Sequence, residues 1–231
     1  MSDPALSGAA LFWNAFGVVG GVIFYSRFYV QWLYSEFKRR SIVPPLFWYQ
    51  SAIGSFTLLM YAIYCQSPLG ALSQSVNIVP YTRNLVYIWK EQGKLSKSRN
   101  VVVHAFVGVV AVTGITVTLW LWWREYRITS GETVAQQRQT WFWLAVGLVG
   151  QGLFASRFLV QWIATERSRK SVVPPIFWYI SLLAAALQCV TFFQRGGGEL
   201  VYAIGLIATM VVYVRNIWLI RTRPPEENPS S

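Results

Sequence analysis

The chain has 231 residues, of which 54% are hydrophobic and only 13% are charged. An average soluble domain has about 25% charged residues, so this composition excludes an ordinary soluble globular protein. The formal net charge of +11 would suggest a nucleic-acid partner in a soluble protein, but in a membrane chain basic loops set the orientation, and we expect no nucleic acid.

Seven long apolar runs follow one another along the chain and predict seven transmembrane helices. About 20 residues of helix cross the roughly 30 Å hydrocarbon core of a bilayer. The runs are continuous and do not alternate with period two, which favours helices over the strands of a barrel. We therefore predict an all-α integral membrane protein. The predicted spans are 11–34, 45–65, 69–89, 101–123, 141–164, 175–194 and 199–220.

An internal repeat organises these helices. Residues 26–51 and 156–181 are identical at sixteen of 26 positions, at an offset of 130, and the match resumes at 81–84 and 213–216 after a two-residue shift. The predicted repeats cover 11–90 and 141–221, and an additional linker transmembrane helix covers 101–123. Because the linker adds one crossing, the two three-helix bundles should lie parallel, a 3-1-3 plan that is recurrent among parallel-repeat transporters.

The basic residues of the loops predict the orientation. With the N-terminus outside the cytoplasm, twelve Lys and Arg fall in cytoplasmic loops and tail, and four fall on the opposite side. This bias follows the positive-inside rule. We therefore expect the N-terminus outside and the C-terminus inside.

Four arginines fall inside the predicted helices, where a charge costs at least about 2.5 kcal/mol. No Asp or Glu within the helices is available to pair with them, so we expect an anionic ligand, and arginine suits bidentate recognition of phosphate. Arg27 and Arg157 are the stronger candidates, because the 1.5 Å rise per residue places them about 12 Å from their helix ends. Arg83 and Arg215, roughly 8–9 Å deep, are equally well explained as anchors that reach the interface.

Polar side chains near these arginines complete the predicted ligand-binding site. Gln31 and Gln161 share a helical stripe with Arg27 and Arg157, at spacings of three or four residues. The third and seventh predicted helices add further polar residues. The candidate ligand-binding set is Arg27, Gln31, Asn77, Arg83, Asn84, Arg157, Gln161, Arg215 and Asn216.

Two proline pairs, Pro44-Pro45 and Pro174-Pro175, follow Ser41 and Ser171. One interpretation is that each pair begins a helix and that the serine caps it, since proline in a first turn loses no hydrogen bond. The other is a hinge between loop and helix, and both can hold. The aromatic triplets that follow, at 47–49 and 177–179, are interpreted as an interfacial aromatic belt.

The sequence shows no nucleophile–base pair, metal-ligand cluster or phosphate loop. We therefore expect no active site, no metal and no cofactor. Cys65 and Cys189 have no metal-ligand spacing and are interpreted as buried thiols, although their places near the outer helix ends would allow a disulfide.

The SRFxVQW…SxVPPxFWY pattern, present twice, resembles the lipid A disaccharide synthase N-terminal domain family of bacterial envelopes. The three-one-three plan also resembles the SWEET and PQ-loop superfamily, with PP where that superfamily often has PQ. Thr209 stands opposite Asn77 where sugar carriers tend to show two asparagines, which argues against a free sugar. The resemblance implies a multi-pass protein of the bacterial inner membrane with a link to lipid A assembly. In that membrane, the orientation expected from the basic residues places the N-terminus in the periplasm and the C-terminus in the cytoplasm. The resemblance does not imply catalysis, because the sequence holds no soluble glycosyltransferase domain.

The leading hypothesis is a membrane carrier or binding protein for a phosphorylated glycolipid, such as a polyprenyl-phosphate sugar or a lipid A precursor, in lipopolysaccharide assembly. Its expected partners are membrane lipids of this kind. One alternative is a SWEET-like carrier of small neutral sugars. Another is a non-transporting accessory that docks a membrane glycosyltransferase.

Overall fold

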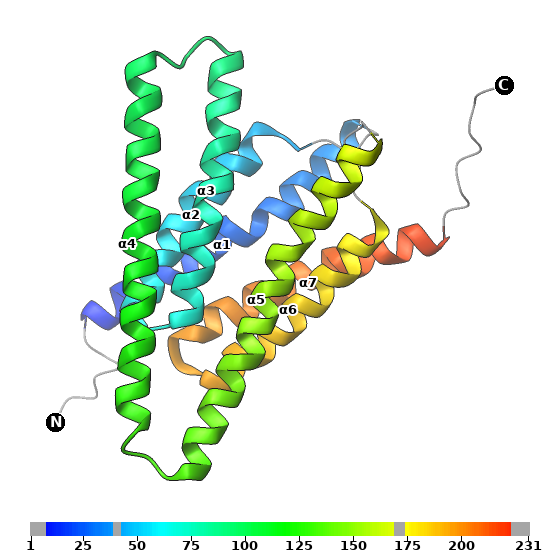
Figure 1. Ribbon diagram of the computed structural model, residues 1–231. Helices are drawn as coiled ribbons and strands as arrows, with labels where there is room; N and C mark the ends of the chain where they lie inside the picture. The colour runs from blue at the N-terminus through cyan, green and yellow to red at the C-terminus, as the bar shows by residue number, and fades with distance from the viewer. Residues whose placement is uncertain (1–7, 39–42, 169–173, 223–231) are drawn as a thin grey trace.

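The computed structural model describes residues 8–38, 43–168 and 174–222, and in these ranges every regular element is a helix. Figure 1 shows the helices in chain order. A short 3-10 helix, η2, links the last two. The elements are α1 (Gly8–Lys38), α2 (Pro45–Tyr64), α3 (Pro68–Glu91), α4 (Lys97–Thr129), α5 (Val134–Ser168), α6 (Pro175–Arg195), η2 (Gly197–Glu199) and α7 (Leu200–Thr222).

Each predicted span falls within one of these helices or extends beyond it by a single residue. Among the described residues, six helices are long and apolar enough to cross a membrane, and α3 is the exception. Its helix contains Gln74, Asn77 and Asn84, together with Pro80 in its interior. These polar residues lower its hydropathy, so the prediction of a membrane span is supported by length and composition for six helices and not for α3.

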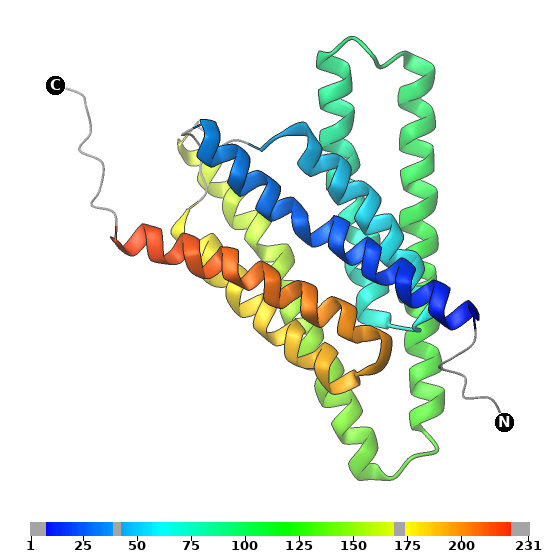
Figure 2. The ribbon, with the colours of Figure 1, turned by 180° about the vertical axis from the view of Figure 1, so that it is seen from behind.

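Within each repeat, helices that are consecutive in the chain pack against one another. Helix α2 packs against α1 and α3, and α6 packs against α5 and α7. The two repeats meet where α1 lies beside α7, as seen from behind in Figure 2, and where α3 approaches α5. The hydrophobic core therefore runs through both repeats, from Phe24 and Leu58 to Phe192 and Tyr213.

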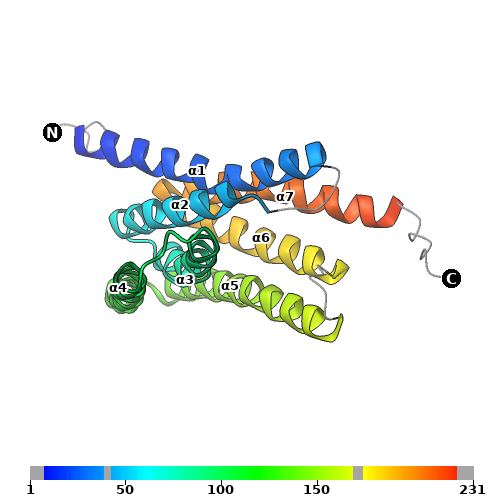
Figure 3. The same ribbon diagram turned by 90° about the horizontal axis from the view of Figure 1, so that it is seen from above.

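Helix α4 lies at the edge of the molecule. Seen from above in Figure 3, it is viewed nearly end on beside α3, its principal neighbour. Only 11% of its most apolar stretch is buried. An apolar helix with so little protein around it is suited to contact lipid on most of its surface.

The two proline pairs begin helices, as one of the two interpretations predicted. Pro44 and Pro174 are the N-cap residues of α2 and α6 in extended backbone conformation, and Pro45 and Pro175 follow in the first turn. These N-cap prolines form no side-chain cap hydrogen bond, and the serine cap stays a prediction. A first-turn proline needs little capping because its missing N–H would have had no partner within the helix. Ser41 and Ser171 lie outside the described residues, and the hinge stays a prediction.

A glycine in α7 allows the two repeats to approach closely. A Cβ placed on Gly205 would collide with the ring of Tyr25, which projects from α1. Tyr25 is buried, and its hydroxyl donates to the backbone carbonyl of Tyr202, 3.5 Å away. Small residues at such contacts let helix backbones approach within a membrane. The α1–α7 contact therefore depends on the missing side chain of Gly205.

We predict that Gly205→Leu destabilises the protein, because overpacking a tight contact costs about 1–3 kcal/mol. Thermal unfolding of the detergent-solubilised protein would measure the loss. Gly152→Leu is the matched control, because Gly152 is also in a helix interior and a Cβ added there would meet nothing within 4 Å. Equal thermal stability of the two variants would contradict the close α1–α7 contact.

Candidate functional site

A small cavity of about 50 Å³ lies between the two repeats, lined by residues of α1, α3, α5, α6 and α7. This volume has room for a few water molecules or one small group. No Asp or Glu is among its described lining residues. Its polar and charged lining consists of Tyr25, Arg27, Ser73, Gln74, Asn77, Gln151, Arg157, Gln188, Tyr202, Thr209 and Tyr213.

Arg27 projects into this cavity from α1 and is only 4% exposed. Its guanidinium carbon lies 3.5 Å from the ring centre of Phe24, 4.7 Å from that of Phe28 and 5.2 Å from that of Tyr81. Such cation–π contacts recover part of the cost of burying the charge. Its Nε and Nη1 atoms are buried and have no hydrogen-bond partner within the described chain. Two nitrogens of a buried cation, with three N–H bonds, are thus left for a ligand.

Arg157 occupies the equivalent position of the second repeat and is 7% exposed. Its Nη1 donates a hydrogen bond of 3.1 Å to the hydroxyl of Tyr213. Its guanidinium carbon lies 4.5 Å from the ring centre of Phe154. Both arginines therefore point into one cavity, as the shared stripe predicted, but their surroundings differ.

The aromatic triplets, interpreted as an interfacial belt, also contribute to these surroundings. Phe47 and Phe177 each lie 5.7 Å from the guanidinium carbon of the arginine in their own repeat. Only the tyrosines of the triplets are exposed and lie at the molecular surface. Neighbouring residues of a helix point in different directions, so one triplet serves both the arginine and the surface.

A polar wall of the cavity was missed by the sequence analysis. The Ser73 hydroxyl and the Gln188 amide both donate to Oε1 of Gln151, each at 2.6 Å. Next to Ser73, Gln74 accepts a hydrogen bond of 3.0 Å from Ser55. The prediction drew mainly on features that both repeats share, whereas Ser73, Gln151 and Gln188 are each polar in one copy only. The positions where one copy is polar and the other is not would have revealed it.

The remaining polar candidates are divided between cavity and helix backbone. Asn77 lines the cavity. Asn84 and Asn216 instead donate to carbonyl groups four residues earlier in their own helices, at 2.7 and 2.8 Å. Gln31 and Gln161 are half-buried and are not part of the cavity lining. Of the predicted uncharged residues, the structure therefore brings only Asn77 to the two arginines.

The outer pair of arginines lies away from the cavity. Arg83 is exposed and lies 3.4 Å from the hydroxyl of Tyr87. Arg215 forms an ion pair of 3.4 Å with Glu36, so the expectation that it is unpaired is wrong. The pairing residue is at the end of α1, far away in sequence, where helix-by-helix inspection could not connect it. Both positions fit the anchoring interpretation.

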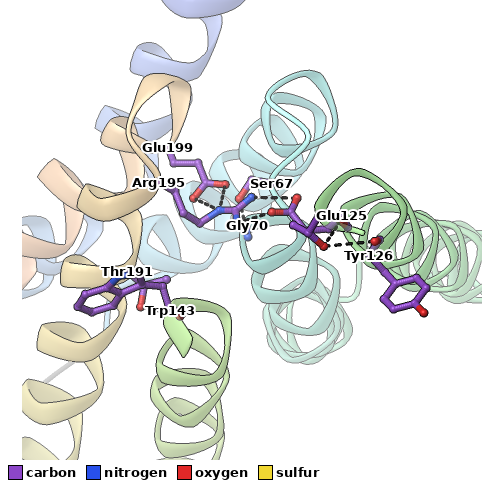
Figure 4. Close-up of polar contacts among 9 residues, drawn as sticks. Ser67, Gly70, Glu125, Tyr126, Trp143, Thr191, Arg195 and Glu199 are labelled. Carbon is purple, nitrogen blue, oxygen red and sulfur yellow. Dashed lines mark hydrogen bonds and ion pairs between the residues drawn. The ribbon is translucent and has the colours of Figure 1, made fainter. Parts of the chain in front are cut away.

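Another charged cluster lies at the opposite end of the molecule. Figure 4 shows Arg195 between two carboxylates, with Ser67 close by. Its Nε donates to Glu199 at 2.9 Å and its Nη1 to Glu125 at 3.0 Å. A hollow of about 410 Å³ adjoins the cluster. Because both carboxylates already bind this guanidinium, the cluster ties α4 to the α6–α7 connection and is a poor anion site.

Metal ligation and disulfide bonding find no support in the ranges that the structure describes. No group of three or more His, Cys, Asp or Glu in these ranges is placed to hold a metal ion. Cys65 and Cys189 are separate thiols, and Cys189 is buried with its sulfur 3.6 Å from the carbonyl of Ala203. The central cavity with its two arginines is therefore the candidate ligand-binding site.

We predict opposite stability effects for the two kinds of arginine. In lipid-depleted protein, Arg27→Met should raise the thermal unfolding temperature, because it removes a buried cation that has no carboxylate beside it. Arg195→Met should lower it, since it leaves the buried Glu199 carboxylate without its partner, at a cost of about 1–3 kcal/mol. Thermal scans in one detergent would compare them. A loss in Arg27→Met as large as in Arg195→Met would show that Arg27 is fully compensated by its surroundings.

Six apolar helices, an internal repeat and a buried two-arginine cavity define this chain as a multi-pass helical membrane protein with a candidate site for an anion. The Lipid A Biosynthesis N-terminal domain family model matches the chain twice, at residues 16–86 and 146–218. The two matches correspond to the two repeats and together cover more than half of the sequence. The chain belongs to this family.

Curated relatives carry the name lipid-A-disaccharide synthase. The chain is 27% identical to that of Chlamydia felis over 91% of its own length, and 29% identical to that of Chlamydia caviae over 93%. It is also 29% identical to the Chlamydia trachomatis serovar D protein over 84%. It spans only 34% of the first two relatives and 32% of the third, about a third of each. No solved structure matches the chain significantly.

Proposed function

We propose that this protein is a membrane carrier or binding protein for a phosphorylated glycolipid, such as a polyprenyl-phosphate sugar or a lipid A precursor, in lipid A and lipopolysaccharide assembly. The observation that carries the proposal is the buried pair of unpartnered nitrogens on Arg27, facing a cavity that Arg157 also lines. The family's description, Lipid A Biosynthesis N-terminal domain, supports the pathway.

Charge balance favours an anion at this site. Two guanidiniums line the cavity and no described carboxylate does. In a medium of low dielectric constant, neighbouring charges of equal sign are costly, and a bound anion offsets that cost. A neutral sugar would bring no charge to offset it, which disfavours the alternative of a small-sugar carrier.

Donor geometry favours phosphate among anions. A guanidinium is planar and carries N–H groups on each of its three nitrogens, so it can donate to several oxygens of one phosphate. On Arg27, Nε and Nη1 are without a partner and lie on different sides of the guanidinium, so each can donate to a separate phosphate oxygen, while the ring contacts hold the group in place. The cavity of about 50 Å³ is suited to a compact headgroup and leaves the lipid chain outside, between the helices.

The proposal includes the SWEET-like 3-1-3 plan, in which α3 also crosses the membrane, sheltered by its neighbours. The packing of α2 and α4 against α3 supports this, because polar residues are tolerated in a span that faces protein. The two repeats would then move relative to each other around the cavity, with Pro44-Pro45 and Pro174-Pro175 as hinges.

The orientation we propose places the N-terminus in the periplasm and the C-terminus in the cytoplasm of a bacterial inner membrane. The start of α1 and the end of α7 lie at opposite ends of the molecule in Figures 1 and 2, which is compatible with this topology. The orientation itself rests on the distribution of basic residues.

We predict that Ser130→Cys is labelled by a membrane-impermeant thiol reagent from the periplasmic side, whereas Ser96→Cys is protected until the inner membrane is permeabilised. Both serines are at helix ends, one before α4 and the other after it. Spheroplasts of a strain with Cys65 and Cys189 replaced would provide the background. The reverse labelling pattern would contradict the orientation.

A second candidate function is that of a non-transporting accessory to a membrane glycosyltransferase. The relatives favour it, because the matching segment is about a third of longer proteins named lipid-A-disaccharide synthase. Such a segment would hold the lipid substrate beside a catalytic partner. In either role we expect the chain to bind its ligand without transforming it.

We predict that Arg27→Lys and Arg157→Lys reduce the copurification of phosphorylated lipid about tenfold or more, since lysine keeps the charge but lacks the paired donors. Native mass spectrometry of the purified variants would measure bound lipid. Arg83→Lys is the matched control, because Arg83 is exposed and lysine can reach the interface equally well.

The proposal would fail if wild-type protein carried no phosphorylated lipid and bound none when supplied with a polyprenyl phosphate. Equal lipid binding by all three lysine variants and the wild type would remove the role of the guanidinium pair. If Arg83→Lys were the only variant to lose bound lipid, the phosphate would lie at the membrane surface.

A further inference from the structure

The cavity is asymmetric, although the two repeats that enclose it are similar. Gln151 and Gln188 of the second repeat correspond, at the offset of 130, to Gly21 and Leu58 of the first. Ser73 of the first repeat corresponds, at the offset of 132 that holds for α3 and α7, to Gly205. All three members of the polar wall are therefore glycine or leucine in the other copy.

The opposite side of the cavity is closed by aromatic side chains. The ring of Tyr25 occupies the space over Gly205, where a Cβ would collide with it. Tyr202 is 1% exposed, and its hydroxyl donates to the carbonyl of Leu58 at 2.6 Å. A ligand that meets both arginines therefore finds the side-chain amides and the serine hydroxyl of the wall toward α3, α5 and α6.

The polar wall offers one donor and one acceptor. Oε1 of Gln151 is occupied by the donors from Ser73 and Gln188. Of the hydrogen bonds among described residues, none involves the amide nitrogen of Gln151 or the amide oxygen of Gln188, and both side chains line the cavity. A hydroxyl both donates and accepts, so it is a suitable partner for such a pair.

We propose that Ser73, Gln151 and Gln188 form a hydroxyl-recognising subsite, which selects a phosphate that carries a sugar over the same phosphate without one. This inference rests on the proposed function, since it takes the arginines as the phosphate ligands. The sugar hydroxyls nearest the phosphate meet Gln151 and Gln188, while Ser73 orients the Gln151 amide. The cavity of about 50 Å³ holds the phosphate and its nearest atoms, and the rest of the sugar enters as the repeats separate.

Amide side chains that hydrogen-bond a substrate hydroxyl discriminate strongly against a ligand that lacks this hydroxyl. When such a ligand binds, the amide is left buried and without a hydrogen-bond partner. The test uses two probes in detergent micelles, a polyprenyl phosphate and the same lipid with one hexose on its phosphate. Native mass spectrometry titrations give the affinity ratio of the two lipids for the wild type and each variant.

We expect the wild type to prefer the glycosylated lipid, and Gln151→Met to reduce that preference about tenfold while its affinity for the bare phosphate stays within about twofold. Ser73→Ala should reduce the preference less, and it keeps the test valid if Gln151→Met does not fold. Gln139→Met, an exposed change on the same helix, is the control. Arg27→Met should lose both lipids.

Three results would be decisive against the inference. Equal wild-type affinity for the two lipids overturns the subsite and leaves the proposed phosphate site intact. The subsite is also overturned if Gln151→Met and Ser73→Ala weaken the binding of both lipids equally, or if they weaken the binding of neither lipid. Failure of the wild type to bind either lipid overturns the proposed function and the subsite together.

Discussion

A guanidinium cannot be deprotonated in a protein, and Arg27 carries one into a buried cavity that holds no carboxylate among its described lining residues. The surrounding structure compensates for that charge. The helices of the first repeat turn aromatic faces toward it, from Phe24 on α1 to Tyr81 on α3. In the second repeat the buried charge of Arg157 is stabilised by a hydrogen bond as well, which the hydroxyl of Tyr213 accepts. A charge that cannot be neutralised thus determines which side chains each repeat directs inward.

Much of this arrangement could be predicted because it is local or repeated. The length of each apolar run predicts the position of a helix, and the identical residues at a fixed offset predict the internal repeat. The i, i+3 and i, i+4 spacing then places Arg27 and Arg157 on inward stripes. The pairing of charges could not be predicted, because it depends on contact between distant segments. Glu36 reaches Arg215 across 179 residues of sequence, and Glu125 reaches Arg195 across 70. Helix periodicity says which way a residue faces on its own helix, but not which residue of another helix it meets.

The duplicated unit also shows how one sequence pattern supports two different local structures. Corresponding aromatic residues lie near both arginines, with Phe47 and Phe177 at the same distance from their guanidiniums. Around this shared frame the copies have diverged, with glycine and tyrosine closing the α1–α7 side and polar residues lining the other. Backbone packing needs the shared residues in both copies, whereas a single ligand at the centre meets each copy once.

The charged cluster around Arg195 has a mechanical consequence. Arg195 joins α4 to the α6–α7 connection, and Glu199 also accepts a hydrogen bond from Ser67, between α2 and α3. At this end, both repeats and the linker are therefore fastened to one another by charge-assisted bonds (Figure 4). A rocking motion of one repeat against the other would have its fulcrum here. Displacement would increase with distance from the fulcrum, and the opposite end, where the chain passes into α2 and α6 through prolines, would travel furthest.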